Sequence, residues 1–381
     1  MTASPRGPLD GVRVVTFAPL YQGPYATTLL ADLGADVVTV ERPGTGDGAR
    51  AQGHMFGALN RGKRSITLDL KDPAGQERAR RLARTADILV EAFRPGTMDR
   101  YGLGYPRLSA ANPGLVYVSL SGFGQDGPYR DRAGHDLVYQ AAAGLLDALA
   151  DRPGAVHPPP DLETGAIVGA LYTVIGALAG LIGRSALGRG TYIDLSTQEA
   201  LLSVIPLRLD PVLNGGDAPQ RGGHDPGYGL YRCADGRLIA LGIGFEDHFW
   251  AALCRATGLT EYADLRQADR LAGGDRIAAR LSEALATRPY PEWQAEFDRI
   301  GVPVGPVNRL TDILADPHVR ARKAIRTLRG HPARRYARQP LRLSGYAEPE
   351  PGPAPGLGEH TASLLRELDD TSLNPEEVSE P

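Results

Sequence analysis

The sequence has few cysteines, no strong charge of either sign and no apolar leader. Its two cysteines among 381 residues, Cys233 and Cys254, exclude a disulfide framework and a cysteine-based zinc site, and they suit a reducing compartment. Residues 1–10 lack the apolar segment of a secretory signal, so we expect a cytoplasmic protein. The formal net charge of −3 gives no global attraction to nucleic acid or to an anionic membrane, and we expect neither as a partner.

One long stretch near the middle of the chain is free of charged residues. Residues 165–183 would cross most of a bilayer as a helix, at about 1.5 Å per residue. Glycine and alanine dominate the stretch, and Gly169, Gly176 and Gly180 would let other elements pack closely against it. Since 42% of the whole chain is hydrophobic, which is enough for a sizeable core, we expect a buried core helix here.

Strand-like runs alternate with helix-like stretches through the first third of the chain. The runs are short and rich in β-branched residues, and they lie at 11–16, 35–40, 65–70, 87–91 and 115–120. Alternation of this kind predicts an open, parallel α/β sheet with helices on both faces. Ligands of such sheets bind beyond the carboxyl ends of the strands.

The texture changes after about residue 205. Proline, glycine and aspartate become frequent in 206–227, which we interpret as a linker. A hairpin pattern follows, with Asp235-Gly236 at its turn, and helical stretches come after it. Residues 228–316 are therefore expected to form a smaller α+β domain.

Gly122, Gly124 and Gly127 match the Gly-x-Gly-x-x-Gly pattern directly after a predicted strand. The dinucleotide fingerprint needs a helix opening at these glycines, but Pro128 and Tyr129 follow instead. The pattern therefore predicts a tight loop and no nicotinamide or flavin site.

Arginine and lysine gather near several predicted strands. Arg61, Lys63 and Arg64 come just before a strand, while Arg42 and Arg94 follow strands. A solvated loop would explain the first group equally well, but guanidinium groups at several strand ends favour a phosphate-bearing ligand.

A histidine and a carboxylate stand side by side at the start of an apolar helix pattern. In Gly134-His135-Asp136, the carboxylate could orient a catalytic imidazole. Asp136 could equally well cap the helix. The sequence leaves both interpretations open.

In order and spacing, these motifs resemble the CaiB/BaiF family of class III CoA-transferases and α-methylacyl-CoA racemases. The match covers about residues 9–203 and resumes in parts of 228–361. The segments that carry it are Gly23-Pro24, 30–36 (LADLGAD), 41–44 (ERPG), 59–65 (LNRGKRS), 68–70 (LDL), 93–96 (FRPG), 122–128 (GFGQDGP), 133–136 (AGHD) and 188–190 (GRG).

The resemblance implies a fold and a ligand. It implies a large Rossmann-like domain from both chain ends, 1–205 and 325–381, and the small domain at 228–316, in an interlocked homodimer. Coenzyme A would be carried by a thioester substrate, without a metal or prosthetic group. The implied CoA contacts are Arg42, Asn60, Arg61, Lys63, Arg64, Arg94, Arg100, Gly124 and Gln125.

Two features look like the racemase branch of the family. His135 matches one of its two acid/base groups, and Phe245-Glu246 adds Glu246 as a further catalytic candidate. We therefore expect α-proton abstraction and return on a CoA thioester, or related isomerase, lyase or decarboxylase chemistry through an enolate. An ungapped match places the second acid/base group, an aspartate, at Gly165, so Glu163 or Asp161 would replace it.

Two other functions stay open. Asp161-Leu-Glu-Thr-Gly165 resembles the transferase pattern of aspartate, two variable residues, threonine and glycine. A class III CoA-transferase with Asp161 as its nucleophile is therefore one alternative. The other is a catalytically silent acyl-CoA-binding protein that has lost the carboxylate.

Overall fold

The computed structural model describes residues 7–150, 162–217 and 225–373, which divide into two compact units. The first unit contains 7–150, 162–207 and 323–373, so both ends of the described chain contribute to it. The second unit contains 208–217 and 225–322. Each unit is described separately below.

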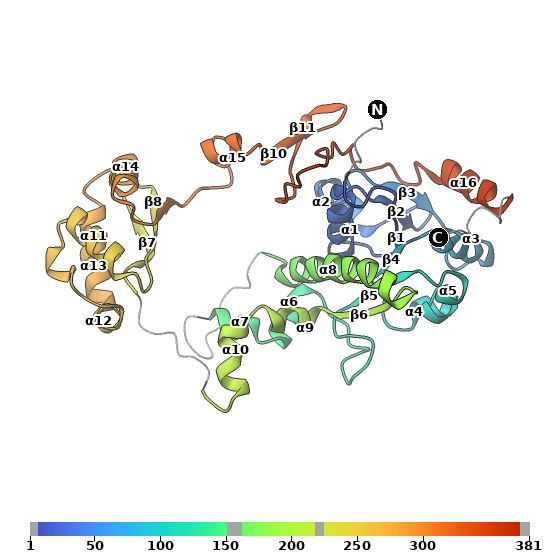
Figure 1. Ribbon diagram of the computed structural model, residues 1–381, viewed down its shortest axis with the longest axis horizontal. Helices are drawn as coiled ribbons and strands as arrows, with labels where there is room; N and C mark the ends of the chain where they lie inside the picture. The colour runs from blue at the N-terminus through green and yellow to red at the C-terminus, as the bar shows by residue number, and fades with distance from the viewer. Residues whose placement is uncertain (1–6, 151–161, 218–224, 374–381) are drawn as a thin grey trace. The chain divides into compact units, whose positions relative to one another are not determined.

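The first unit is built on a six-stranded sheet with the order β3-β2-β1-β4-β5-β6 (Figure 1). All of its strand pairs are parallel. Its strands are β1 (Arg13–Thr16), β2 (Asp36–Glu41), β3 (Arg64–Thr67), β4 (Ile88–Glu91), β5 (Val116–Ser121) and β6 (Tyr192–Ser196). The expected open parallel sheet is confirmed, and its strand order reverses between β1 and β4.

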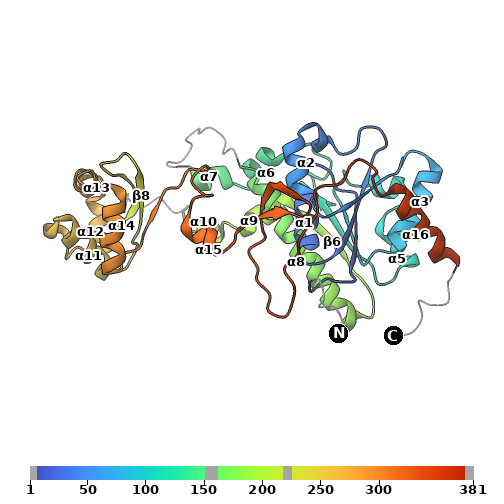
Figure 2. The ribbon, with the colours of Figure 1, turned by 90° about the horizontal axis from the view of Figure 1, so that it is seen from above.

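Helices cover both faces of this sheet because successive side chains of each strand point to opposite faces. Val14 faces a core shared with α1 (Gln22–Asp32) and α8 (Thr164–Leu187). Val15 faces the core of the other side, which includes residues of α3 (Pro73–Arg84), α5 (Tyr105–Ala111) and α16 (Thr361–Leu373). Figure 2 shows the two helix layers with the sheet between them.

Helix α8 differs from the expected buried core helix. One face packs on α1 and β5, but the other exposes large apolar side chains, with Ile182 76% exposed. Among the described residues it is the one helix long and apolar enough to cross a membrane, and 39% of that apolar window is buried. Gly176 and Gly180 face Ile193 and Val116 of the sheet, while Gly169 faces Gln22 of α1.

The remaining helices of the first unit are short and lie mainly in the connections. They are η1 (Gly48–Ala51), α2 (Gly53–Leu59), α4 (Thr97–Arg100), α6 (Asp136–Ala142), α7 (Leu145–Leu149) and α9 (Thr197–Ser203). A two-stranded antiparallel ribbon, β10 (Ile325–Leu328) with β11 (His331–Ala337), precedes the return of the chain to α16.

The second unit is α+β. Its antiparallel sheet has the order β7-β8-β9 and packs on helices around Trp250, Trp293 and Phe297. Gly236 takes a φ of 79° at the hairpin turn between β7 and β8. The elements are β7 (Tyr228–Arg232), β8 (Leu238–Gly242), α11 (Asp247–Thr257), η2 (Thr260–Tyr262), α12 (Gln267–Ala272), α13 (Gly274–Leu285), α14 (Tyr290–Ile300), β9 (Val304–Pro306) and α15 (Pro317–Ala321).

Two boundaries differ from the sequence expectation. The stretch expected as a linker from residue 206 begins with a helix, α10 (Pro206–Leu213). Pro206 occupies its first position, where proline is tolerated, and Pro211 falls near its end. The second unit also continues past the expected bound at residue 316, through α15 to Arg322.

Candidate functional site

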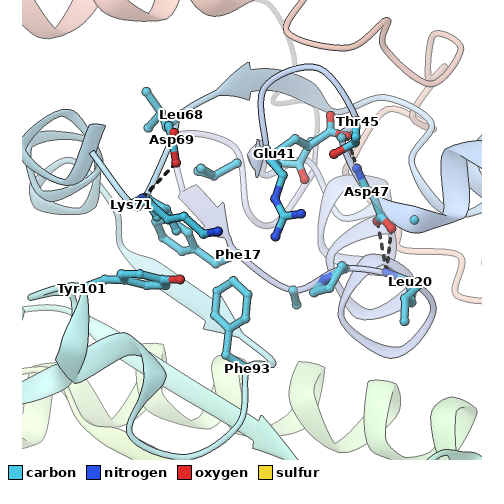
Figure 3. A pocket seen from close by; sticks show the side chains of 18 of the residues that line it. Phe17, Leu20, Glu41, Thr45, Asp47, Leu68, Asp69, Lys71, Phe93 and Tyr101 are labelled. Atoms are coloured by element: carbon cyan, nitrogen blue, oxygen red, sulfur yellow. Dashed lines mark hydrogen bonds between the residues drawn. The ribbon is translucent and has the colours of Figure 1, made fainter. Parts of the chain in front are cut away.

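The carboxyl ends of four neighbouring strands open into a cavity of about 600 Å³ (Figure 3). Its lining residues lie in or just after β1, β2, β3 and β4, which include the two strands where the order of the sheet reverses. Parallel α/β sheets bind ligands at this position. The lining residues are 17–20, 39–42, 45–48, 51, 68–71, 93 and 101.

Aromatic rings form one side of this cavity. Phe93 and Tyr101 meet edge to face with ring centroids 6.5 Å apart, and Phe17 lies beside them (Figure 3). Thr45 and Asp47 lie across the cavity from the rings. A slot with rings on one side and polar groups on the other suits a flat heteroaromatic group with polar edges.

The polar side of the cavity includes strained backbone that a carboxylate holds in place. Leu20 has a φ of 71°, in the left-handed region that a branched side chain rarely adopts. Its N–H donates to both carboxylate oxygens of Asp47 at 3.0 Å (Figure 3). Asp47 Oδ1 also accepts from the N–H of Ala49 at 2.9 Å and so caps η1. One carboxylate therefore joins the loops that follow β1 and β2.

The charges around the cavity differ in how they are compensated. Burial opposes ionisation of Glu41, but hydrogen bonds from Arg50 and Ser65 outweigh it and keep its pKa below the usual value. Arg42 and Lys71 also line the cavity, and neither makes an ion pair within the described chain. Arg42 and Lys71 are therefore called the free cations of the cavity. The sequence analysis did not name Lys71 as a ligand contact, although it directly follows the motif at 68–70.

Of the nine predicted CoA contacts, Arg42 is the one that lines this cavity. Three of the others, Asn60, Arg61 and Lys63, make contacts that hold the fold. Arg61 pairs with the buried Asp32, and its guanidinium lies 4.8 Å from the ring centre of Tyr336. Lys63 donates to Asn60 Oδ1 at 2.9 Å and to two backbone carbonyl oxygens at 2.8 Å. Burial keeps the pKa of Lys63 well below its usual value.

Arg64 is the first residue of β3, so it lies at the amino edge of the sheet. There it pairs with Asp36 and with Glu367 of α16, and Arg13 pairs with the same two carboxylates. A residue that opens a parallel strand and one that follows it lie at opposite edges. Arg64 is therefore placed at the edge opposite the cavity.

The other predicted contacts lie in the loops after β4 and β5. Arg94 is exposed, and Arg100 donates to Thr97 Oγ1 at 2.9 Å. Gly124 has a φ of 90° and its N–H donates to Ser121 Oγ at 2.9 Å, while the N–H of Gln125 donates to an aspartate of β6. These bonds make a tight loop, as the glycine pattern predicts.

The carboxylate of Asp136 bonds to residues of α6 and α8, and no hydrogen bond joins it to its sequence neighbour His135 among the described residues. Its Oδ1 accepts from the N–H of Ala166 at 2.6 Å, and its Oδ2 accepts from Gln140 Nε2. Asp136 therefore satisfies a free N–H in the first turn of α8, the second helix after its own. The imidazole of His135 is exposed just ahead of α6 and makes no hydrogen bond within the described residues.

The position expected for the racemase aspartate has no room for a side chain. A Cβ atom at Gly165 would lie 2.8 Å from Asp136 Oδ1 and 3.2 Å from side-chain carbons of Leu201 and Thr197. An aspartate there would also bring two carboxylates together, which is strongly unfavourable. The carboxylate of Asp136 occupies the space beside residue 165.

The remaining candidate carboxylates have different surroundings. Glu163 is exposed directly ahead of α8, and after burial its charge is the largest cause that raises the pKa of Tyr21. Asp161 lies outside the described residues. Glu246 belongs to the second unit, where its Oε2 accepts from the N–H of Gly244 at 3.0 Å.

Residues 9–361 match the family model of CoA-transferase family III. The chain belongs to CoA-transferase family III. It is 34% identical over 382 residues to the acetyl-CoA:oxalate CoA-transferase of Acetobacter aceti, covering 96% of this chain and 97% of that protein. It is 33% identical to the human succinyl-CoA:glutarate CoA-transferase, covering 95% and 86% of the two chains. A CaiB/BaiF family protein from Brucella suis superposes with a TM-score of 0.85 at 34% identity, covering 96% and 100%.

Membership of CoA-transferase family III confirms the resemblance and corrects the expected reaction. The curated relatives are named for transfer of coenzyme A between acids, so the racemase-like interpretation, with its related enolate chemistry, is wrong. The ungapped match behind that interpretation placed the essential aspartate at Gly165. Asp136 occupies that space, so the fold does not favour an aspartate at residue 165.

Proposed function

We propose that the protein transfers coenzyme A from a CoA thioester to a short dicarboxylic acid, with Asp161 as the nucleophile. Oxalate, glutarate and mesaconate, the acids in the names of several relatives, each carry two carboxyl groups. The observation that carries the choice of Asp161 is the closed position at Gly165. Asp161 comes directly before the described turn Leu162–Ala166 in the sequence.

The proposed reaction needs only the carboxylate and the two substrates. Asp161 attacks the thioester carbonyl carbon, the carbon–sulfur bond breaks, and the CoA thiolate leaves with the electron pair. The thiolate then attacks the aspartyl carbonyl of the resulting anhydride, so that the donor acid leaves as a carboxylate and CoA is held on Asp161. The acceptor carboxylate reverses both steps, and no proton is gained or lost.

The cavity of Figure 3 would hold the nucleotide end of coenzyme A. Its rings suit the adenine, and its free cations, Arg42 and Lys71, suit phosphate groups. The exposed Arg94, after β4, would attract the second carboxylate of the acceptor.

We also propose a cytoplasmic homodimer. The helices α6 and α8 pack on each other, and both expose large apolar side chains, among them Leu137 and Val138 of α6, which a second copy would bury. Cys233 and Cys254 are buried and unpaired, which agrees with a reducing compartment.

Trapping the covalent intermediate tests the nucleophile. The protein is incubated with acetyl-CoA or succinyl-CoA, treated with borohydride or hydroxylamine, and analysed by intact mass and peptide mapping. We expect an adduct on Asp161 that Asp161→Asn abolishes and Glu163→Gln retains. An adduct on Glu163 would contradict the assignment, and bound thioester without any adduct would favour a silent binding protein.

A second measurement tests the acceptor. With the donor fixed, CoA transfer to oxalate, succinate and glutarate is compared with transfer to acetate and butyrate. We expect faster transfer to the dicarboxylates, and equal rates with the matched monocarboxylates would overturn this part of the proposal.

A further inference from the structure

We infer that Asp136 is a positioning residue for the nucleophile, because it fixes the turn of chain that directly follows Asp161. This inference rests on the proposed function, in which Asp161 attacks the thioester. Asp136 touches neither substrate in it. Its action goes through the described residues Leu162–Ala166, which continue into α8.

Two side chains of α6 hold this turn from one side. Asp136 Oδ1 accepts from the N–H of Ala166 at 2.6 Å. Gln140 Nε2 donates to Asp136 Oδ2 and also to the carbonyl oxygen of Leu162 at 3.4 Å. These contacts hold the peptide between Leu162 and Glu163, which begins at the residue directly after Asp161 in the sequence, and the helical N–H of Ala166.

A third side chain holds the same turn from α1. Gln22 Nε2 donates to the carbonyl oxygen of Gly165 at 3.4 Å and to Thr197 Oγ1 at 2.9 Å. The absence of a side chain at Gly165 leaves the space that Asp136 Oδ1 occupies. Residues of α1, α6 and α9 therefore meet around one turn of backbone.

The bonding of Gln140 indicates that this arrangement serves orientation more than hydrogen-bond satisfaction. Gln140 is 1% exposed, and its Oε1 is buried without a partner among the described residues. A buried amide normally pairs both of its ends. Here both contacts of Gln140 are made by Nε2, one to Asp136 and one to Leu162.

Orientation and general stability predict different kinetics. A carboxylate that only caps a helix would stabilise the fold without favouring one chemical step. A group that aims the nucleophile changes the rate of attack at saturating donor, because a displacement of about 1 Å can slow a reaction about 100-fold. Binding of coenzyme A in the cavity of Figure 3 should not change, since none of its lining residues contacts Asp136.

The experiment measures the rate of adduct formation on Asp161 at saturating acetyl-CoA, together with the Kd for coenzyme A. We expect Asp136→Ala to slow adduct formation about 100-fold while the Kd stays within about twofold. Asp136→Asn keeps an oxygen that accepts from Ala166, so it should restore at least a tenth of the native rate. Gln140→Leu tests the other contact and should also slow adduct formation.

Asp316→Ala is the matched control, because Asp316 Oδ1 caps α15 in the second unit by accepting from the N–H of Val319 at 2.8 Å. It should lower the melting temperature and leave the adduct rate unchanged. The inference is overturned if Asp136→Ala reacts at the native rate, if its loss matches a loss of CoA binding, or if Asp136→Asn is no better than alanine. A native protein without an adduct on Asp161 would instead overturn the proposed function, which the native sample shows by itself.

Discussion

The backbone N–H of Leu20 donates to both carboxylate oxygens of Asp47 at 3.0 Å, while Leu20 itself holds a φ of 71°. Left-handed backbone at a branched residue costs roughly 1–3 kcal/mol, so it persists only where other contacts fix it. Asp47 supplies those contacts and receives its own orientation from its N–H, which donates to Glu41 Oε2 at 3.0 Å. The polar wall of the cavity is therefore formed before any ligand enters.

Removing the Asp47 carboxylate should weaken binding of coenzyme A. We expect Asp47→Ala to raise the Kd for coenzyme A about tenfold, or about 1.4 kcal/mol, because the loop at Leu20 would relax when free and would have to be ordered again on binding. Isothermal titration measures the Kd. The loss of the cap on η1 should also lower the free energy of unfolding by about 1 kcal/mol.

Leu20→Gly separates strain from hydrogen bonding. Glycine adopts the same φ without strain, so the free energy of unfolding of this variant should lie within about 1 kcal/mol of that of the native protein. A Kd of Asp47→Ala equal to that of the native protein would show that the strained loop has no part in binding.

Cations in the cavity should affect binding of coenzyme A, whereas the cation at the opposite edge of the sheet should affect stability. Arg42→Ala and Lys71→Ala remove the free cations of the cavity, and each should weaken binding of coenzyme A at low salt by a factor of about 10 to 150, since a hydrogen bond to a charged group contributes about 1.5–3 kcal/mol. The difference should shrink as salt is added.

Arg64→Ala is the matched control at the opposite edge of the sheet. It loses the ion pairs with Asp36 and Glu367, so it should lower the melting temperature and leave the Kd for coenzyme A unchanged. A rise of the Kd for Arg64→Ala as large as that for Arg42→Ala would contradict the placement of the ligand.

The sequence was sufficient to predict the parallel sheet, and the cavity opens at the strand ends where such sheets bind ligands. It was not sufficient where the exact strand bounds decide at which edge of the sheet a residue lies. Arg42 directly follows β2 and lines the cavity, whereas Arg64 opens β3 and points to the other edge. Composition cannot separate these cases, because both are arginines beside a strand. The exact bounds of the strand are needed.

The contact between Asp136 and Ala166 lay further beyond sequence reasoning. The two residues are 30 positions apart, and the intervening chain includes residues that the structure does not describe. The sequence left two roles open for Asp136, which were to cap a helix or to orient His135. Capping was the right chemistry, but the capped helix is α8, which only packing of α6 against α8 could reveal.

Glu91 should make the stability of the protein fall as pH rises. Burial raises the pKa of Glu91 to about 7, and the charges of Asp99 and Asp194 add to this. Below about pH 4.5 the carboxyl group is protonated in both the folded and the unfolded chain. Between about pH 4.5 and 7 the unfolded chain releases its proton first, so folding loses up to about 3 kcal/mol across that range and nothing more above it.

Urea unfolding at several pH values from 5 to 8 checks this expectation. Glu91→Gln cannot ionise, so its stability should fall less with pH than that of the native protein, while the exposed Glu283→Gln should follow the native curve. Parallel curves for Glu91→Gln and the native protein would show that Glu91 is already ionised when folded at pH 5.

The closed position at Gly165 leads to a last prediction, which distinguishes CoA transfer from enolate chemistry. Attack on the thioester carbonyl leaves the α-carbon untouched, so acyl-CoA incubated with the protein in heavy water should gain no deuterium there by mass spectrometry. Gly165→Asp would supply the aspartate of the racemase pattern, but its Cβ would lie 2.8 Å from Asp136 Oδ1. We expect this variant to lose about 2–4 kcal/mol of stability, from overpacking and from like charges, without gaining α-proton exchange. Exchange by the native protein that His135→Ala abolishes would contradict the transfer mechanism, because it would require a base at the α-carbon.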